Sequence, residues 1–179
     1  IAAGLLTGKL QGGRFAHLVS AGFRGESVMA CALGAQVVFP GLGRALGLSD
    51  AVVVVVWCLL ATALVLLSVA NSSMPWMRVV TLGLVANVLV VAANTGMPVG
   101  TGVSPSSTEF AMALQESPIH VPVTERTKLV WLADLVPVPG PRGVRGRASI
   151  GDVALAVGVA GIVSQMMRGP VHDGSHEVS

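Results

Sequence analysis

Long apolar runs separated by short polar turns dominate the hydrophobic pattern of this chain. The clearest run is Ala51–Ala70, twenty residues without a charge, of which twelve are Val or Leu. A helix of this length spans about 30 Å, the thickness of a bilayer's hydrocarbon core, whereas a strand normally ends after about 4–8 residues. The run therefore predicts a transmembrane helix.

The same pattern predicts three further complete spans and the end of another. The complete spans are expected at 27–46, 51–70, 75–95 and 150–167, and residues 1–8 are expected to be the end of a truncated first span. A long loop, 96–149, joins the last two spans, and the polar residues 169–179 are expected to form a flexible tail. The predicted fold class is all-α: a polytopic transmembrane helical bundle that forms a single domain over residues 1–168.

The long loop is expected to carry short interfacial helices. Ser106–Glu109 has the pattern of a capping box, which predicts a short helix directly after it. Residues 124–135 are expected to form a second short helix at the membrane interface, with Trp131 on its apolar side. The proline-containing segments 117–123 and 136–147 should be extended.

Composition supports a membrane protein and excludes a nucleic-acid partner. The chain is 53% hydrophobic and only 11% charged, against about 25% charged residues in soluble proteins. A net charge of +2 without a basic stripe of interleaved aromatics does not fit nucleic-acid binding. The basic residues divide almost evenly between the two membrane sides. Because Lys9, Arg14 and Arg24 gather in the short first loop, we expect that loop inside and the long loop outside.

Four polar residues lie within the spans or at their ends: Gln36, Asn87, Asn94 and Asp152. Asn87 and Asn94 are seven residues apart, so they share one helix face, which must point at protein because an amide facing lipid would be unsatisfied. A role for Asp152 in capping the last helix is favoured over a role in transport or ligand binding. We expect Asn94 and Asp152 to approach closely, with the long loop folded over both.

A run of three arginines precedes the last span. Arg142, Arg145 and Arg147 lead to Ser149 at the start of a helix, whose free N–H groups favour an anion such as a lipid headgroup or an acidic patch of a partner. The simpler alternative, which the pattern favours, is that these side chains are only solvated at headgroup level.

No motif indicates a metal, a cofactor or a catalytic centre. His120, Glu125 and Asp134 share the long loop but have no ligand spacing, so solvated or capping roles are favoured. His172 and His176 are four residues apart, but they lie in the predicted tail without a helical context. We therefore expect no metal, no cofactor and no recognisable catalytic residues.

Three ordered motifs carry a resemblance to a known family. Asn94-Thr95-Gly96-Met97-Pro98-Val99 leaves one span, Trp131-Leu132-Ala133-Asp134 lies in the loop, and Ser149-Ile150-Gly151-Asp152-Val153 opens the last span. Together with Gly12-Gly13-Arg14, this set resembles the family of small polytopic membrane proteins DUF5317. The resemblance implies a multi-pass protein of the bacterial cytoplasmic membrane and no particular activity.

Three hypotheses for function remain. The first is a non-enzymatic accessory or scaffold subunit that packs against other membrane proteins or against a second copy, with membrane lipids around it. The second is a small carrier or channel with a polar site at Asn87, Asn94 and Asp152. The third is an interfacial lipid-binding or lipid-modifying protein. The lack of catalytic motifs and the small-residue faces of the spans favour the first.

Overall fold

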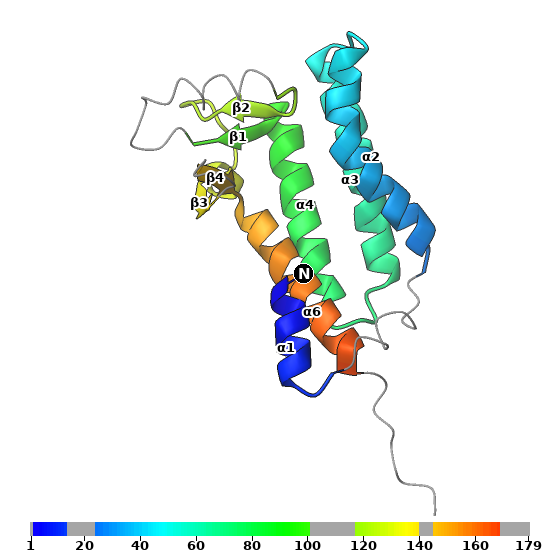
Figure 1. Ribbon diagram of the computed structural model, residues 1–179. Coiled ribbons are helices and arrows are strands. Elements are labelled where there is room, and N and C mark those ends of the chain that lie inside the picture. The colour runs from blue at the N-terminus through cyan, green and yellow to red at the C-terminus, as the bar shows by residue number, and fades with distance from the viewer. Residues whose placement is uncertain (1, 14–23, 101–116, 140–144, 169–179) are drawn as a thin grey trace, which may run out of the picture.

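The computed structural model describes residues 2–13, 24–100, 117–139 and 145–168, and it is mainly helical (Figure 1). Its helices are α1 (Ala2–Leu10), α2 (Glu26–Ala45), α3 (Asp50–Ala70), α4 (Met77–Asn94) and α6 (Ile150–Arg168). Among the described residues, α2, α3, α4 and α6 are long and apolar enough to cross a membrane. The predicted all-α transmembrane bundle is confirmed.

The helices pack in the order α2, α3, α4, α6 and α1 (Figure 1). The pair α4–α6 forms the centre, and α2 packs against α3 at one side. Helix α1 runs parallel to α6, because Gly4 lies against Ala160 while Gly8 lies further along, against Met167. One end of the bundle therefore carries the C-terminal ends of α1, α3 and α6, and the other carries the C-terminal end of α4.

Short strands at the C-terminal end of α4 organise the long loop (Figure 1). They are β1 (Met97–Val99), β2 (His120–Pro122), β3 (Val136–Pro139) and β4 (Arg145–Ala148). Strands β1 and β2 pair in parallel, and Val99 also forms a parallel bridge with Asp134. Strands β3 and β4 form an antiparallel pair that leads into α6. The predicted extended character of 117–123 and 136–147 is confirmed at these strands, whereas Pro118 and Ile119 form a turn.

The helix expected over residues 124–135 is wrong. Only a single 3₁₀ turn, η2 (Val130–Leu132), forms there. Leu129 has a φ of 52°, a left-handed conformation that ends any α-helix, and the backbone N–H and C=O of Lys128 both bond to the side chain of Asn94. Those groups are therefore unavailable to a helix. The other expected loop helix, after Ser106–Glu109, lies outside the described residues.

The loop is packed onto the bundle by an apolar cluster. Leu132 of η2 and Met97 of β1 are buried with Val54 of α3 and with Val90 and Val91 of α4. Burying side chains of this size contributes about 1.5–3 kcal/mol each. The cluster fixes the described part of the loop over the ends of α3 and α4, where it covers the polar residues of the candidate site.

Candidate polar site under the long loop

Three polar side chains join the start of α6 to the middle of α4. Asn87 Nδ2 donates to Asp152 Oδ1 over 2.7 Å, and the Ser149 hydroxyl donates to Asn87 Oδ1 over 2.9 Å. Within the α6 cap, Ser149 N donates to Asp152 Oδ2, and Asp152 N donates to Ser149 Oγ. This reciprocal pair is a capping box, in which Asp152 and Ser149 satisfy each other's backbone N–H groups. Asn87 adds an interhelical bond to each.

Two glycines allow Asn87 to reach this cap. A Cβ added to Gly83 would lie 2.6 Å from the backbone oxygen of Gly151, so the two helix backbones are nearly in contact. A Cβ added to Gly151 would overlap the Asn87 amide oxygen. Close approach between small residues is a common way for helices to associate in membranes. Here it also places the amide of one helix directly over the N-terminus of another.

The side chain of Asn94 bonds to the long loop and not to Asp152. Its Nδ2 donates to Val90 O and Lys128 O, and its Oδ1 accepts from Lys128 N over 2.8 Å. The expected approach of Asn94 to Asp152 is therefore wrong, because Asn87 is the residue that meets Asp152. Asn87 lies seven residues earlier, about 10 Å along the same helix. The expectation that the loop folds over this end of the bundle is confirmed for its described residues.

The same arrangement occurs at the opposite end of the bundle, on a residue that the sequence analysis did not single out. Asn71, which follows α3, accepts from Arg24 N and donates to Arg24 O and to Leu67 O. Asn71 and Asn94 thus each bond the carbonyl four residues before them and both backbone groups of one distant residue. A small polar residue at the last turn of an apolar span was the available signal for both.

His120 and Asp134 lie close to each other within the long loop. Asp134 is only 6% exposed, its Oδ1 has no hydrogen-bond partner among the described residues, and its Oδ2 lies 3.9 Å from His120 Nε2. The other ring nitrogen of His120, Nδ1, is hydrogen-bonded to the Ser117 hydroxyl. The sequence interpretation of Asp134 as a solvated or simple capping residue is therefore wrong. The apolar Leu132 and Ala133 directly before it, which are both buried, were the available signal.

Burial sets the protonation of this pair. Loss of solvent, reinforced by the negative charge of Asp152, raises the pKa of Asp134 from 3.8 to about 7. Burial also lowers the pKa of His120, against a smaller opposite effect of Asp152. Below about pH 7 the carboxyl of Asp134 is therefore mainly protonated, and near pH 7 it is about half protonated beside a neutral imidazole. Such a pair can hold and exchange a proton close to physiological pH.

The arrangement of Ser117, His120 and Asp134 suits proton binding better than nucleophilic catalysis or metal binding. Ser117, His120 and Asp134 are the residue types of a hydrolytic triad, but the 3.9 Å between His120 and Asp134 exceeds a hydrogen bond. In the part of the chain that the structure describes, no three His, Cys, Asp or Glu side chains are placed to hold a metal ion.

The remaining predicted site residues do not join this cluster. Gln36 is half-buried on α2, which packs against α3. Trp131 is 61% exposed on η2, while Asp134, only three residues later, is buried. Trp131 and Asp134 therefore do not form one site.

The predicted anion site before α6 is only partly described. Arg147 Nη1 donates to Leu135 O, and Arg145 begins β4, whereas Arg142 lies outside the described residues. Ser149 is fully buried, and both its hydroxyl and its N–H are engaged by Asn87 and Asp152. An anion at the arginine run would therefore bind without the Ser149 side chain, and its binding stays a prediction.

The comparison with known proteins places the chain in one family. The family model described as a family of unknown function (DUF5317) matches residues 23–164, which is most of the chain and includes every residue of the polar site described above. The resemblance seen in the ordered motifs is thereby confirmed. Neither a curated protein nor a solved structure matches the chain.

Proposed function

The chain belongs to the DUF5317 family, a family of unknown function. From the geometry of the chain we propose that it is an accessory or scaffold subunit of an assembly of membrane proteins. In this role it packs against another membrane protein or a second copy through the outer face of α2. The observation that supports the proposal is an exposed row of three small residues and one valine on that face. We call this row the α2 ridge: Ala30, Gly34, Val37 and Gly41.

The α2 ridge is open along its length. The spacings of four, three and four residues place its members on one side of the helix, and all of them are exposed. A Cβ added to Gly34 or Gly41 would have no described atom within 4 Å outside its own stretch of α2. The opposite side of α2, with Ala32, Pro40 and Gly43 buried, faces α3.

Glycines on the central helices contrast with those on the ridge. A Cβ added to Gly83, Gly151 or Gly158 would lie within 3 Å of the facing helix of the α4–α6 pair. Glycines that let helices pack closely are thus already used inside the chain, whereas those of the ridge are not. Only 11% of the apolar stretch of α2 is buried within the chain, against 28% for each of α3, α4 and α6. Small residues that face no helix in the described part of their own chain suit a helix of another chain.

A carrier or channel is the weaker candidate. Its predicted site residues Asn87 and Asp152 bond each other and Ser149, and Asn94 bonds backbone groups of its own chain. Between this site and the opposite end, the two central helices are in close contact at Gly83, Gly151 and Gly158. The polar groups expected to line a route are therefore engaged in fixing helix ends and the loop.

Native mass spectrometry of the full chain, extracted from its own membrane in a mild detergent, tests the proposal. We expect a second polypeptide, either another membrane protein or a second copy of this chain, to be extracted with it at a constant stoichiometry. Gly34→Leu or Ala30→Leu should reduce that species by at least about tenfold, which corresponds to about 1.4 kcal/mol.

Ala92→Leu is the matched control, since Ala92 is exposed on α4 and the same side chain is added there. Extraction of the wild-type chain alone would refute the proposal. So would equal loss of the second species in Ala30→Leu and Ala92→Leu, because the ridge would then have no special role.

A further inference from the structure

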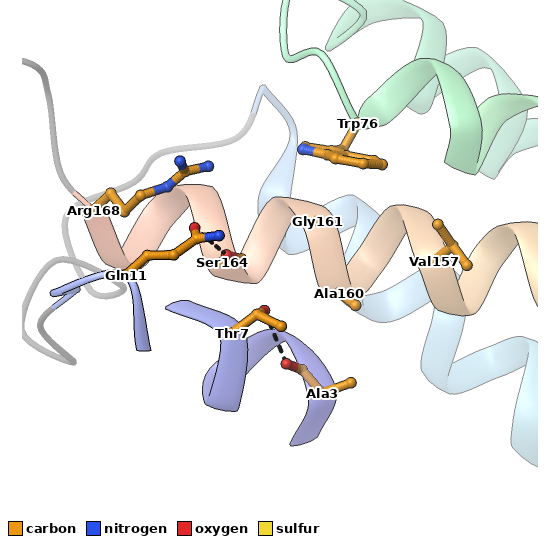
Figure 2. A pocket seen from close by; sticks show the side chains of 9 residues that line it. All are labelled: Ala3, Thr7, Gln11, Trp76, Val157, Ala160, Gly161, Ser164 and Arg168. Atoms are coloured by element: carbon orange, nitrogen blue, oxygen red, sulfur yellow. Dashed lines mark hydrogen bonds between the residues drawn. The ribbon is translucent and has the colours of Figure 1, made fainter. Parts of the chain in front are cut away.

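An open groove runs along α6 at the end of the bundle opposite the long loop (Figure 2). It has a volume of about 280 Å³. Its lining residues come from α1, the turn after α1, α6 and the residue before α4: Ala3, Thr7, Gln11, Trp76, Val157, Ala160, Gly161, Ser164 and Arg168. One face of α6 forms the floor, with α1 along one side and the Trp76 ring along the other (Figure 2).

Close packing of its walls makes the groove a fixed feature of the fold. A Cβ added to Gly4 of α1 would lie 2.5 Å from Ala160 O, so α1 sits directly on α6. On the other side the Trp76 ring covers Gly161 so closely that a Cβ there would overlap it. Between the two walls the floor contains small side chains, which leave the space unfilled. Preformed hollows of this kind are typical of ligand sites.

The groove is polar at one end and apolar at the other. Ala3 and Val157 line the part nearer the middle of α6, whereas Gln11 directly follows α1 and Arg168 ends α6 (Figure 2). The Ser164 hydroxyl donates to Gln11 Oε1 over 3.4 Å, and the Gln11 amide nitrogen and the Arg168 guanidinium lie at the same end (Figure 2). Hydrogen-bond donors thus gather where the helices leave the apolar layer.

The charge of this end favours an anion. The described residues here comprise four basic side chains and one acidic side chain: Lys9, Arg24, Arg78, Arg168 and Glu26. Trp76 is 38% exposed at the start of α4, the depth at which tryptophan normally marks the membrane–water interface. An arginine at this depth attracts anionic lipid headgroups.

We propose that this groove is a binding site for one anionic phospholipid. Its acyl chain lies on the α6 floor between α1 and Trp76, and its phosphate accepts hydrogen bonds from Arg168 and Gln11. The hollow is too small for a helix of another protein, whose diameter is about 10–12 Å, whereas a single chain of methylene groups fits it. The proposal is independent of the α2 ridge, which lies on the other side of the bundle.

The test measures binding of phosphatidylglycerol and of phosphatidylcholine with the same acyl chains to the delipidated full chain in detergent, by native mass spectrometry. We expect the wild type to prefer phosphatidylglycerol by at least about fivefold. Arg168→Gln should abolish that preference, whereas Arg78→Gln, which removes a charge at the same end but outside the groove, should keep it.

A second pair of variants tests whether the acyl chain binds in the apolar part of the groove. Val157 and Val153 are both exposed on α6, but only Val157 lines the groove. Val157→Trp should fill the apolar part and weaken binding of both lipids at least about fivefold, and Val153→Trp should leave it unchanged. A wild type without preference, or equal effects of Arg168→Gln and Arg78→Gln, would overturn the headgroup site. Equal effects of the two tryptophan variants would overturn the proposed position of the acyl chain.

Discussion

Replacing Asp134 by Asn should remove the contribution of this carboxyl to the pH dependence of stability, which is a fall in stability between about pH 4 and pH 7. Burial raises the pKa of Asp134 from 3.8 to about 7, so the folded chain holds a proton on this carboxyl that the unfolded chain has already lost. Stability therefore falls as the pH rises from about 4 to about 7, and Asp134 causes no further loss above that. An asparagine side chain does not titrate, so the variant lacks this fall.

The pKa difference sets the size of the effect. A pKa of about 7 against 3.8 corresponds to roughly 4 kcal/mol for complete titration, of which roughly 2.5 kcal/mol falls between pH 5 and pH 8. For a chain of this size 1 kcal/mol shifts the melting temperature by about 2–4 °C. The melting temperature of Asp134→Asn, relative to the wild type, should therefore rise by roughly 5–10 °C from pH 5 to pH 8.

Thermal unfolding followed by tryptophan fluorescence in one detergent measures this difference. His120 faces Asp134, and its lowered pKa acts in the opposite direction. Stability falls as the pH drops below 6.5, because the unfolded chain binds a proton that the half-buried ring of the folded chain binds less readily. The comparison is therefore repeated in a His120→Gln background. Asp50→Asn is the matched control, because Asp50 is exposed at the start of α3. A difference between Asp134→Asn and the wild type that stays constant from pH 5 to pH 8 would refute the reasoning.

Two further predictions concern the α6 cap. Asn87→Ala should destabilise the chain by about 1–3 kcal/mol, because it leaves the Ser149 hydroxyl without its acceptor, and a double-mutant cycle with Ser149→Ala should show that the two losses are not additive. Gly151→Ala should lower the melting temperature because its methyl group displaces the Asn87 amide, whereas Gly34→Ala, with open space around it, should be neutral or stabilising by up to about 1 kcal/mol. Equal melting temperatures for the two alanine variants would contradict the close helix crossing.

The transmembrane helices could be predicted because their signal is local. Each predicted span agrees with its helix to within about two residues, as 51–70 does with Asp50–Ala70. A long uncharged run has few alternatives in a bilayer, where backbone groups must bond within the segment. Turn residues then set the ends: Gly47, for example, has a φ of 72° between α2 and α3.

The long loop could not be predicted in the same way because distant contacts decide its structure. Residues 124–135 contain apolar positions at helical spacing, yet Asn94 holds the Lys128 backbone from 34 residues away. The partner of Asp152 was missed for a related reason. Both Asn87 and Asn94 lie on the correct face of α4, and only the close crossing at Gly83 and Gly151 decides which of them reaches the cap.

The distribution of hydrogen bonds separates structural polar groups from candidates for binding. Asn71, Asn87 and Asn94 have both their amide nitrogen and their oxygen bonded within the chain, so they fix helix ends and loops and have little capacity left for a ligand. Asp134 differs, because one of its oxygens is buried without a partner among the described residues. Leaving such a group unpaired costs about 1–3 kcal/mol, more when it is charged, and protonation avoids the larger cost. Polar atoms that the fold does not use, rather than the most polar helix face, are therefore the candidates for binding at this end of the bundle.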